Sequence, residues 1–483
     1  MKKNEFKIII CKLFTFLLVL VKCLRYTVFI IKSKAVKKME PIIRLKEVSL
    51  NNIKNVCHGS FKTNTDFSNM KKSDLIGFYG QNGSGKTAIV EVFNILQELL
   101  LDYPLPNKES YLLTQGKKKI SLFFEFLILN RLGEFTVIYS VDLKEGENGL
   151  YVDREELTYR ENILYRKFKN IVLKDNSNLI IKKIILQDLP EEERINCIVI
   201  DKTSTKERKS FIFNPELSNI YSRYLNDTEI ELVNNLIFDF NENFYIIDDK
   251  QNGVVLANLL MPFSASIQNH RRKFSYDLDK PTLLEMDCYF SMKKTINQIN
   301  IVLKNIIPDL QIIINSQESN KEIMENGKTG IRFELLSKKK GVELPLKCES
   351  AGVLKIISIL SSLIKVANNP NACVVIDELD SGIFEYLLGN IIQSIDETGK
   401  GQFFFTSHNL RILEVLNHKK VWFTTNNPDN RLIQLKGVRP LSNQRDIYLR
   451  SIFLGGQQET LYDDTDLYEL QKSFFVAGKN NDK

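Results

Sequence analysis

The feature that most constrains this chain is a glycine-rich segment, Gly80–Thr87, with the pattern Gly-x-x-x-x-Gly-Lys-Thr. It follows a short apolar stretch typical of a buried strand, residues 74–79, and precedes residues 88–101, whose apolar positions recur at helical spacing. Glycines let backbone N–H groups turn toward phosphate oxygens, and the N-terminus of the following helix attracts an anion. The segment therefore predicts a nucleotide-phosphate site formed by Gly80, Gln81, Asn82, Gly83, Ser84, Gly85, Lys86 and Thr87.

Two side chains of this segment have distinct expected roles. Lys86 supplies a positive charge to the β- and γ-phosphates, and we also expect it to take part in catalysis. Thr87 is expected to ligate Mg²⁺ through its hydroxyl group. The alternative is a chance glycine-rich turn, which the flanking strand and helix argue against.

A second apolar strand, residues 372–376, ends in the acidic pair Asp377 and Glu378. Ligands of open α/β sheets bind at the carboxyl ends of the strands, so this pair is expected beside the phosphates. We expect Asp377 to hold Mg²⁺ through water, and Glu378 to orient or deprotonate the water that attacks the γ-phosphate. Taken alone, an acidic pair at a strand end is often a surface turn; the glycine-rich segment favours the catalytic interpretation.

Three shorter motifs surround this pair: Ser350-Ala-Gly352 upstream, Asp380-Ser381 immediately after it, and His408 in Thr-Ser-His-Asn after another apolar stretch. Their order resembles the signature, D-loop and switch histidine of ABC-type ATPases. The Asp-Glu-Leu-Asp and Thr-Ser-His-Asn forms are most similar to the OLD/RecF/SMC-like branch. That branch includes the AAA-15/AAA-21 ATPases of bacterial anti-phage systems. The resemblance covers residues 42–172 and 345–440, roughly half of the chain.

The resemblance implies a homodimer that sandwiches two ATP molecules with Mg²⁺. Ser350 and the Gly352 N–H would clamp the γ-phosphate of ATP bound to the opposite subunit, and His408 would contact the γ-phosphate. Asp380, in the segment that resembles the D-loop, would be one of the nucleotide-binding residues. Ser350 has the simpler alternative of capping its own helix, and a lone histidine is usually a core or surface residue.

The implied fold class is α/β: a P-loop ABC-type ATPase with an antiparallel β lobe and a large mixed insertion between the phosphate loop and the signature. Lys86 and Asp377 are 291 residues apart, more than a compact domain of this type needs. The expected divisions, in chain order, are a basic apolar tail, a first ATPase lobe with the phosphate loop, a mostly helical insertion, and a second ATPase lobe with the other motifs: 1–40, 41–172, 173–340 and 341–483.

The sequence departs from the family pattern at two places. Gln115 and Gln268 are both weak candidates for the glutamine that usually couples the insertion to the nucleotide. Only 75 residues follow His408, fewer than an added Toprim nuclease domain needs. The acidic cluster Asp463, Asp464 and Asp466 is interpreted as a solvated turn. We therefore expect any effector, a nuclease or a toxin, to be a separate chain.

Charge is concentrated at the N-terminus. Residues 1–40 carry a net charge of +8, so the formal total of +7 leaves the remaining residues at −1. Residues 8–31 are apolar but interrupted by Lys12, Lys22 and Arg25, which oppose membrane insertion. Three interpretations remain: an interfacial helix or poor anchor, a signal peptide, and translation that starts at Met39. We expect a cytoplasmic protein, with membrane contact through residues 8–31 only if the tail is real.

The leading prediction is an ATP-hydrolysing switch, the sensor component of a bacterial defence module with a separate effector. The alternative is a RecF- or SMC-like ATPase that binds DNA directly in repair or chromosome maintenance. Basic runs at 270–273 and 338–340 would serve that alternative, whereas the −1 charge of the body argues against it.

Overall fold

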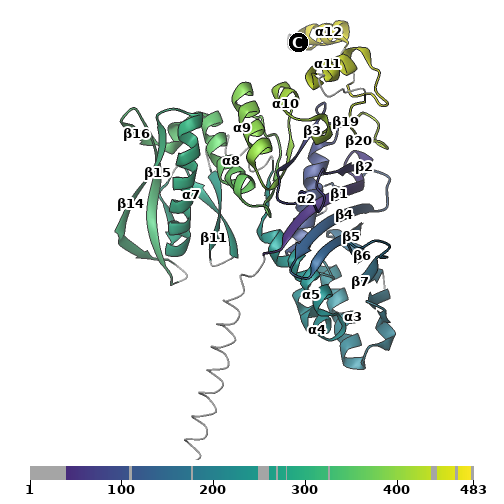
Figure 1. Cartoon of the computed structure of the whole chain (residues 1–483). Helices are drawn as coiled ribbons and strands as arrows, with labels where there is room; N and C mark the ends of the chain where they lie inside the picture. The colour runs from purple at the N-terminus through teal and green to yellow at the C-terminus, as the bar shows by residue number, and fades with distance from the viewer. Residues whose placement is uncertain are drawn as a thin grey trace, which may run out of the picture.

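The computed structural model describes the residues 40–107, 111–175, 178–248, 260–267, 270–278, 280–324, 327–436, 443–462 and 466–479. The tail 1–39, Gln268, Asp463 and Asp464 lie outside this set, so the predictions for them are not addressed by the structure. The molecule has a central sheet flanked by an antiparallel β lobe on one side and by a smaller lobe on the other (Figure 1).

The central sheet has six strands, and it carries both predicted halves of the site. Its strand order is β10-β17-β18-β3-β19-β20, and all neighbours are parallel except β19 and β20. In chain order the strands are β3 (Asp74–Tyr79), β10 (Phe244–Ile247), β17 (Cys373–Ile376), β18 (Gln402–Thr406), β19 (Val421–Thr424) and β20 (Leu432–Ile433). The glycine-rich segment follows β3, the acidic pair follows β17, and the histidine motif follows β18. Because these strands are parallel, all three segments emerge at one edge.

Both faces of this sheet are covered, which explains the nearly continuous apolar runs of its strands. Successive side chains point to opposite faces. In β3, Ile76 and Phe78 join one hydrophobic core, whereas Leu75 and Tyr79 join the other. The first core contains α2 (Lys86–Leu100), and the second contains α7 (Met286–Ile306), α8 (Ala351–Asn368), α9 (Glu385–Thr398) and α10 (Leu410–Val415).

The antiparallel lobe is an eight-stranded sheet in the order β2-β1-β4-β5-β6-β7-β8-β9. Its strands are β1 (Ile42–Ile53), β2 (Val56–Lys62), β4 (Ile120–Asn130), β5 (Gly133–Gly146), β6 (Gly149–Glu161), β7 (Lys169–Asp175), β8 (Asn178–Ile181) and β9 (Ile184–Ile185). A buried amide joins the two sheets: Gln402 of β18 accepts a hydrogen bond from Leu45 N and donates one to Leu45 O, both at 2.8 Å. The predicted antiparallel β lobe is therefore present, and its sheet continues beyond residue 172, the expected end of the first ATPase lobe.

Residues 173–340, predicted as one mostly helical insertion, lie in several places. Their first strands complete the antiparallel sheet, and β10 lies at the edge of the central sheet, paired with β17. Between these are α3 (Glu191–Glu207), α4 (Ser218–Tyr224) and α5 (Asp227–Asn234). The short, fully buried β10 gave no clear signal in the sequence because four apolar residues fit a helix equally well.

The smaller lobe lies beside α8 and combines α7 with strands (Figure 1). The strands β13 (Thr282–Glu285), β14 (Leu310–Ile323), β15 (Thr329–Lys339) and β16 (Val342–Pro345) form one antiparallel sheet, and β11 (Leu260–Ile267) pairs with β12 (His270–Asp277). At the other end of the molecule are α11 (Gln444–Leu454) and α12 (Leu467–Lys479).

Among the described residues, α8 alone has the length and apolar composition of a membrane-spanning helix, and most of it is buried between other elements. A buried core helix meets the same criteria.

Candidate functional site

The glycine-rich segment forms an open loop between β3 and α2. Gly80, Gly83 and Gly85 all have positive φ, at 157°, 77° and 101°. At Gly83 a side chain would have open space, but the left-handed backbone itself favours glycine. Lys86 folds back over the loop, and its Nζ donates to the carbonyl oxygens of Gly80 at 2.8 Å and Gln81 at 3.0 Å. This folds the loop around the ammonium group.

A threonine from β19 fixes the start of the loop. The Oγ1 of Thr424 donates to Tyr79 O at 3.1 Å and shares a hydrogen bond with the hydroxyl of Ser84. A Cβ at Gly80 would lie 1.7 Å from that Oγ1, so only glycine fits there. Thr424 was not predicted, because it lies 340 residues from Ser84 and carries no motif of its own.

A buried arginine contacts the segments that support the loop. Arg431, 6% exposed, donates from Nη2 to Asn55 O at 2.6 Å and from Nη1 to Thr425 O at 2.5 Å. The side chain of Asn55, in the turn between β1 and β2, donates in turn to Gly83 O. The pKa of Arg431 is lowered by burial. These contacts join both hairpins, β1–β2 and β19–β20, to the phosphate loop.

The acidic pair is held by Thr406, the last residue of β18. Its Oγ1 accepts from Glu378 N at 2.8 Å and donates to Asp377 Oδ1 at 2.5 Å. Asp377 is 2% exposed, whereas the Glu378 side chain is exposed. Glu378 has a φ of 46°, a left-handed conformation that costs a non-glycine residue roughly 1–3 kcal/mol. Strain of this kind is common at functional sites.

The predicted charges converge on Lys86. Its pKa is lowered because the ammonium group is buried, and the carboxylates of Asp377, Glu378 and Asp380 act in the opposite direction. The pKa of His408 is lowered as well, first by partial desolvation of the ring and then by the positive charge of Lys86. The backbone N–H of His408 donates to Asp380 Oδ2 at 3.0 Å. The charged groups after β17 and β18 therefore interact electrostatically with Lys86 of the loop.

The predicted signature segment begins α8. The Oγ of Ser350 accepts a hydrogen bond from Val353 N at 3.4 Å, so Ser350 is the N-cap of this helix, and its side chain is exposed. A Cβ at Gly352 would lie 2.2 Å from Gly382 O, so glycine is required where α8 approaches the turn after Asp380. The structure thus gives Ser350 and Gly352 local roles and leaves Ser350 on the surface.

The groups expected to hold ATP and Mg²⁺ suit these ligands chemically. Thr87 and Asn82 are exposed at the loop, and Gln81 is half-buried. Asp377 is a buried carboxylate at the same sheet edge as Thr87, and oxygen ligands of this kind are those that Mg²⁺ prefers. Successive positive-φ glycines at the start of α2 form the type of concave backbone that binds phosphate oxygens.

Other predicted residues lie away from this edge. Gln115 is exposed in a turn between α2 and β4. In the run at 338–340, Lys338 forms an ion pair of 2.8 Å with Glu343, which reduces the positive charge available there. The run at 270–273 lies in β12, and its side chains are outside those that the structure describes.

Residues 75–414 match the family described as "AAA domain, putative AbiEii toxin, Type IV TA system". This range contains the phosphate loop, the signature segment, the acidic pair and the histidine motif.

A curated relative matches a shorter stretch. The methionine import ATP-binding protein MetN 1 of Enterococcus faecalis is 33% identical over 85 residues, which is 16% of this chain and 23% of that protein. The chain therefore aligns with about a quarter of the relative's length.

Solved structures with some similarity include two SMC heads and a RecF protein. An SMC head bound to the C-terminal winged-helix domain of ScpA has a TM-score of 0.41 at 10% identity, covering 81% of this chain and 97% of that one. The SMC head domain from Thermotoga maritima has a TM-score of 0.36 at 13% identity, covering 81% and 99%. RecF with ATP has a TM-score of 0.33 at 12% identity, covering 82% and 100%.

Proposed function

Because the chain belongs to the AAA-domain family described as a putative AbiEii toxin of a type IV toxin–antitoxin system, we propose that it binds ATP with Mg²⁺ and hydrolyses it. One observation supports this most: the phosphate loop, the Asp377–Glu378 pair and His408 lie at one sheet edge, where three carboxylates and the imidazole share the field of Lys86.

Each residue has a task in this proposal. The backbone of the loop from Gly80 to Gly85 and the ammonium group of Lys86 bind the phosphates. Thr87 and Asp377 would hold Mg²⁺, which when bound offsets the negative charge of the phosphate oxygens. Glu378 accepts the proton of the attacking water, and its strained backbone, tied to Thr406, keeps the carboxylate directed outward.

The proposed hydrolysis calls for further groups on the outer side of the γ-phosphate. We propose that a second copy supplies them, with Ser350 and the N-terminus of its α8 facing the first subunit's nucleotide. The exposure of Ser350 supports this arrangement. Asp380 contacts the His408 backbone and closely follows Glu378, so closure of such a dimer would act on both the hydrolytic and the switch residues.

We further propose that this switch is the ATPase component of a bacterial defence module that works with a separate nuclease or toxin. The family description, which names a toxin–antitoxin system, supports a module of paired proteins.

Glu378→Gln tests the hydrolytic role. We expect the variant to bind ATP with unchanged affinity, because the phosphates are held by the loop, and to lose at least about 100-fold in kcat. The measurements are steady-state phosphate release and calorimetric titration with ATP. Glu397→Gln, an exposed residue near the end of α9, is the matched control and should keep full activity. Hydrolysis at the wild-type rate by Glu378→Gln would reject the assignment.

A further inference from the structure

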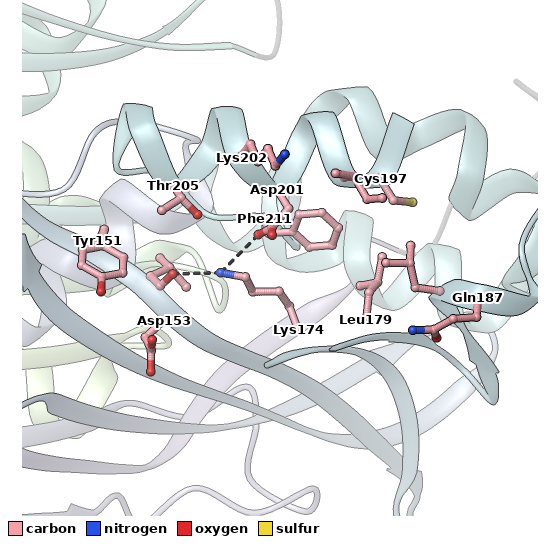
Figure 2. Close-up of a pocket in the computed structure, with 13 residues that line it drawn as sticks. Tyr151, Asp153, Lys174, Leu179, Gln187, Cys197, Asp201, Lys202, Thr205 and Phe211 are labelled. Atoms are coloured by element: carbon pink, nitrogen blue, oxygen red, sulfur yellow. Dashed lines mark hydrogen bonds and ion pairs between the residues drawn. The ribbon is translucent and has the colours of Figure 1, made fainter. Parts of the chain in front are cut away.

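A cavity outside the nucleotide site lies between α3 and the strands β6–β8 of the antiparallel sheet (Figure 2). Its volume is about 610 Å³, within the range of small-ligand pockets. The side chains that line it differ in chemistry from one part of the cavity to another. This difference gives the cavity a polar and an apolar part.

The polar part is built around Lys174 of β7. Its side chain is 6% exposed, and Figure 2 shows it extending from the sheet toward Asp201 on α3. The ammonium group donates to Val152 O at 2.9 Å and forms an ion pair with Asp201 at 3.2 Å. An ammonium group has three N–H donors, and among the described residues only these two partners are found. One donor therefore remains for a ligand in the cavity that Lys174 lines.

Within the part of the chain that the structure describes, both acidic side chains of the lining are in ion pairs, whereas one of its two lysines is not. Asp201 is paired with Lys174, and Asp153 is paired at 3.0 Å with Lys144, which lies outside the lining. Lys202, exposed on α3 at the edge of the cavity, has no ion-pair partner among the residues that the structure describes. The polar part thus favours an anionic group, with the hydroxyl groups of Tyr151 and Thr205 as further hydrogen-bond partners.

The remaining lining is apolar. Leu179, Cys197 and Phe211 are buried, and Leu186 is half-buried. Burial raises the pKa of the Cys197 thiol to about 11, so it stays neutral at physiological pH and acts as a small apolar side chain. In Figure 2, Leu179 and Cys197 lie on the opposite side of Lys174 from Tyr151 and Thr205. A ligand with an apolar body and one anionic group would match both parts.

We propose that this cavity is a binding site for a small organic anion with an apolar or aromatic body. The cavity is also connected to the helix that follows the phosphate loop. The chain just after α3 is joined to the chain just after α2: Leu105 N donates to Arg208 O at 2.8 Å, and Lys209 lies 3.9 Å from Asp102. The helix α2 begins at Lys86 of the phosphate loop and ends at Leu100, close to these contacts, so one helix connects the loop to this part of the molecule. The inference extends beyond ATP hydrolysis and holds whether or not the chain is an ATPase.

The probe for this site is 8-anilinonaphthalene-1-sulfonate, an aromatic anion that fluoresces when it leaves water. The experiment uses the full chain without nucleotide, so an inactive ATPase site does not affect it. We expect one saturable site in the wild type. Lys202→Glu should weaken it about five- to tenfold, because the variant replaces an attractive charge by a repulsive one. Thr205→Trp should abolish it by filling the polar part.

Lys206→Glu is the matched control, since Lys206 is exposed on the same helix, does not line the cavity and undergoes the same charge change. It should bind the probe as the wild type does. Circular dichroism confirms that each variant is folded. The proposal is overturned if the wild type has no saturable site, if Lys202→Glu and Thr205→Trp bind as tightly as the wild type, or if Lys206→Glu weakens binding as much as Lys202→Glu.

Discussion

Thr406 is the residue that holds the two acidic side chains of the site in place. One hydroxyl group accepts from Glu378 N and donates to the carboxylate of Asp377, which is almost fully buried. Loss of that hydroxyl would leave a buried carboxylate oxygen with one donor fewer and would free a strained peptide. The effect should therefore appear in stability and in catalysis together.

We predict that Thr406→Val lowers the free energy of unfolding by about 1–3 kcal/mol, the cost of an unmet buried hydrogen bond. It should also lower kcat for ATP hydrolysis more than it raises the KM, because Glu378 loses its anchor while the loop is untouched. Urea denaturation and steady-state kinetics measure these effects. Thr398→Val, at an exposed position at the end of α9, should change stability by less than about 0.5 kcal/mol. Equal stability of both variants would contradict the role of Thr406.

At this scale, the sequence predicted residues whose chemistry is tied to a local pattern. Asp377 and Glu378 directly follow β17, and Lys86 begins α2 after the loop that follows β3, as the sequence pattern predicts. Thr424 and Arg431 were not found, although they fix the loop, because a threonine or arginine in a hairpin has no pattern that distinguishes it. Their function depends on which strands become neighbours, and that is settled by tertiary packing.

Among the elements, α2 carries a half-buried acid, Glu98. Burial, and secondarily the charge of Glu91, raise the pKa of Glu98 to about 7. Between about pH 4.5 and pH 7, the folded chain therefore keeps the proton of Glu98, whereas the unfolded chain has already released it. Stability contributed by the protonated form is present at low pH and is lost as the pH rises through this interval.

We predict that Glu98→Gln, which mimics the protonated acid, raises the free energy of unfolding by about 2–3 kcal/mol at pH 8 and changes it little at pH 4. Chemical denaturation at the two pH values measures the difference. Glu192→Gln, exposed in the first turn of α3, should show no such pH dependence. An identical change at both pH values for Glu98→Gln would show that the carboxyl group is not responsible.

The β19–β20 hairpin is the element that supports the phosphate loop. Arg431 contacts the backbone at Asn55, and Asn55 contacts Gly83, so the guanidinium group acts on the loop through one intermediate residue. We predict that Arg431→Met weakens ATP binding about tenfold, the effect of losing one hydrogen bond from a charged group, whereas Arg431→Lys recovers part of the affinity by keeping one donor. Calorimetric titration measures both. Arg450→Met, exposed on α11, is the control. If Arg431→Met binds ATP as tightly as the wild type, the β19–β20 hairpin does not support the phosphate loop in ATP binding.

At the scale of the whole molecule, the division of the chain was harder to predict than its motifs. The strands of the central sheet come from three separate parts of the sequence, 74–79, 244–247 and 373–433, with β10 between the helices α5 and α7. The spacing of apolar residues indicates whether a segment is a helix or a strand and which of its faces is buried. It does not indicate the order in which strands from distant parts of the chain pair in a sheet. The predicted limits 173 and 340 therefore follow composition, whereas the fold distributes the same residues over two sheets and a separate lobe.

Assembly of a dimer depends on which of two roles Ser350 has, a cap of its own helix or a contact to the partner's nucleotide. If the serine only caps α8, any good capping residue can replace it; if it also contacts a partner's γ-phosphate, an anionic cap cannot. Aspartate caps helices well and suits a helix N-terminus, but it repels phosphate. Asparagine caps equally well without charge. The pair Ser350→Asp and Ser350→Asn thus separates helix stability from nucleotide contact.

We place both changes in the Glu378→Gln background, where ATP should persist. With ATP and Mg²⁺, light scattering should give about twice the chain mass of 55.9 kDa for Glu378→Gln alone and for its Ser350→Asn form. The Ser350→Asp form should remain a monomer while binding ATP with similar affinity, because the phosphate loop belongs to its own subunit. If the Ser350→Asp form dimerises like the others, Ser350 only caps α8. The proposed contact between Ser350 and the partner's nucleotide is then wrong.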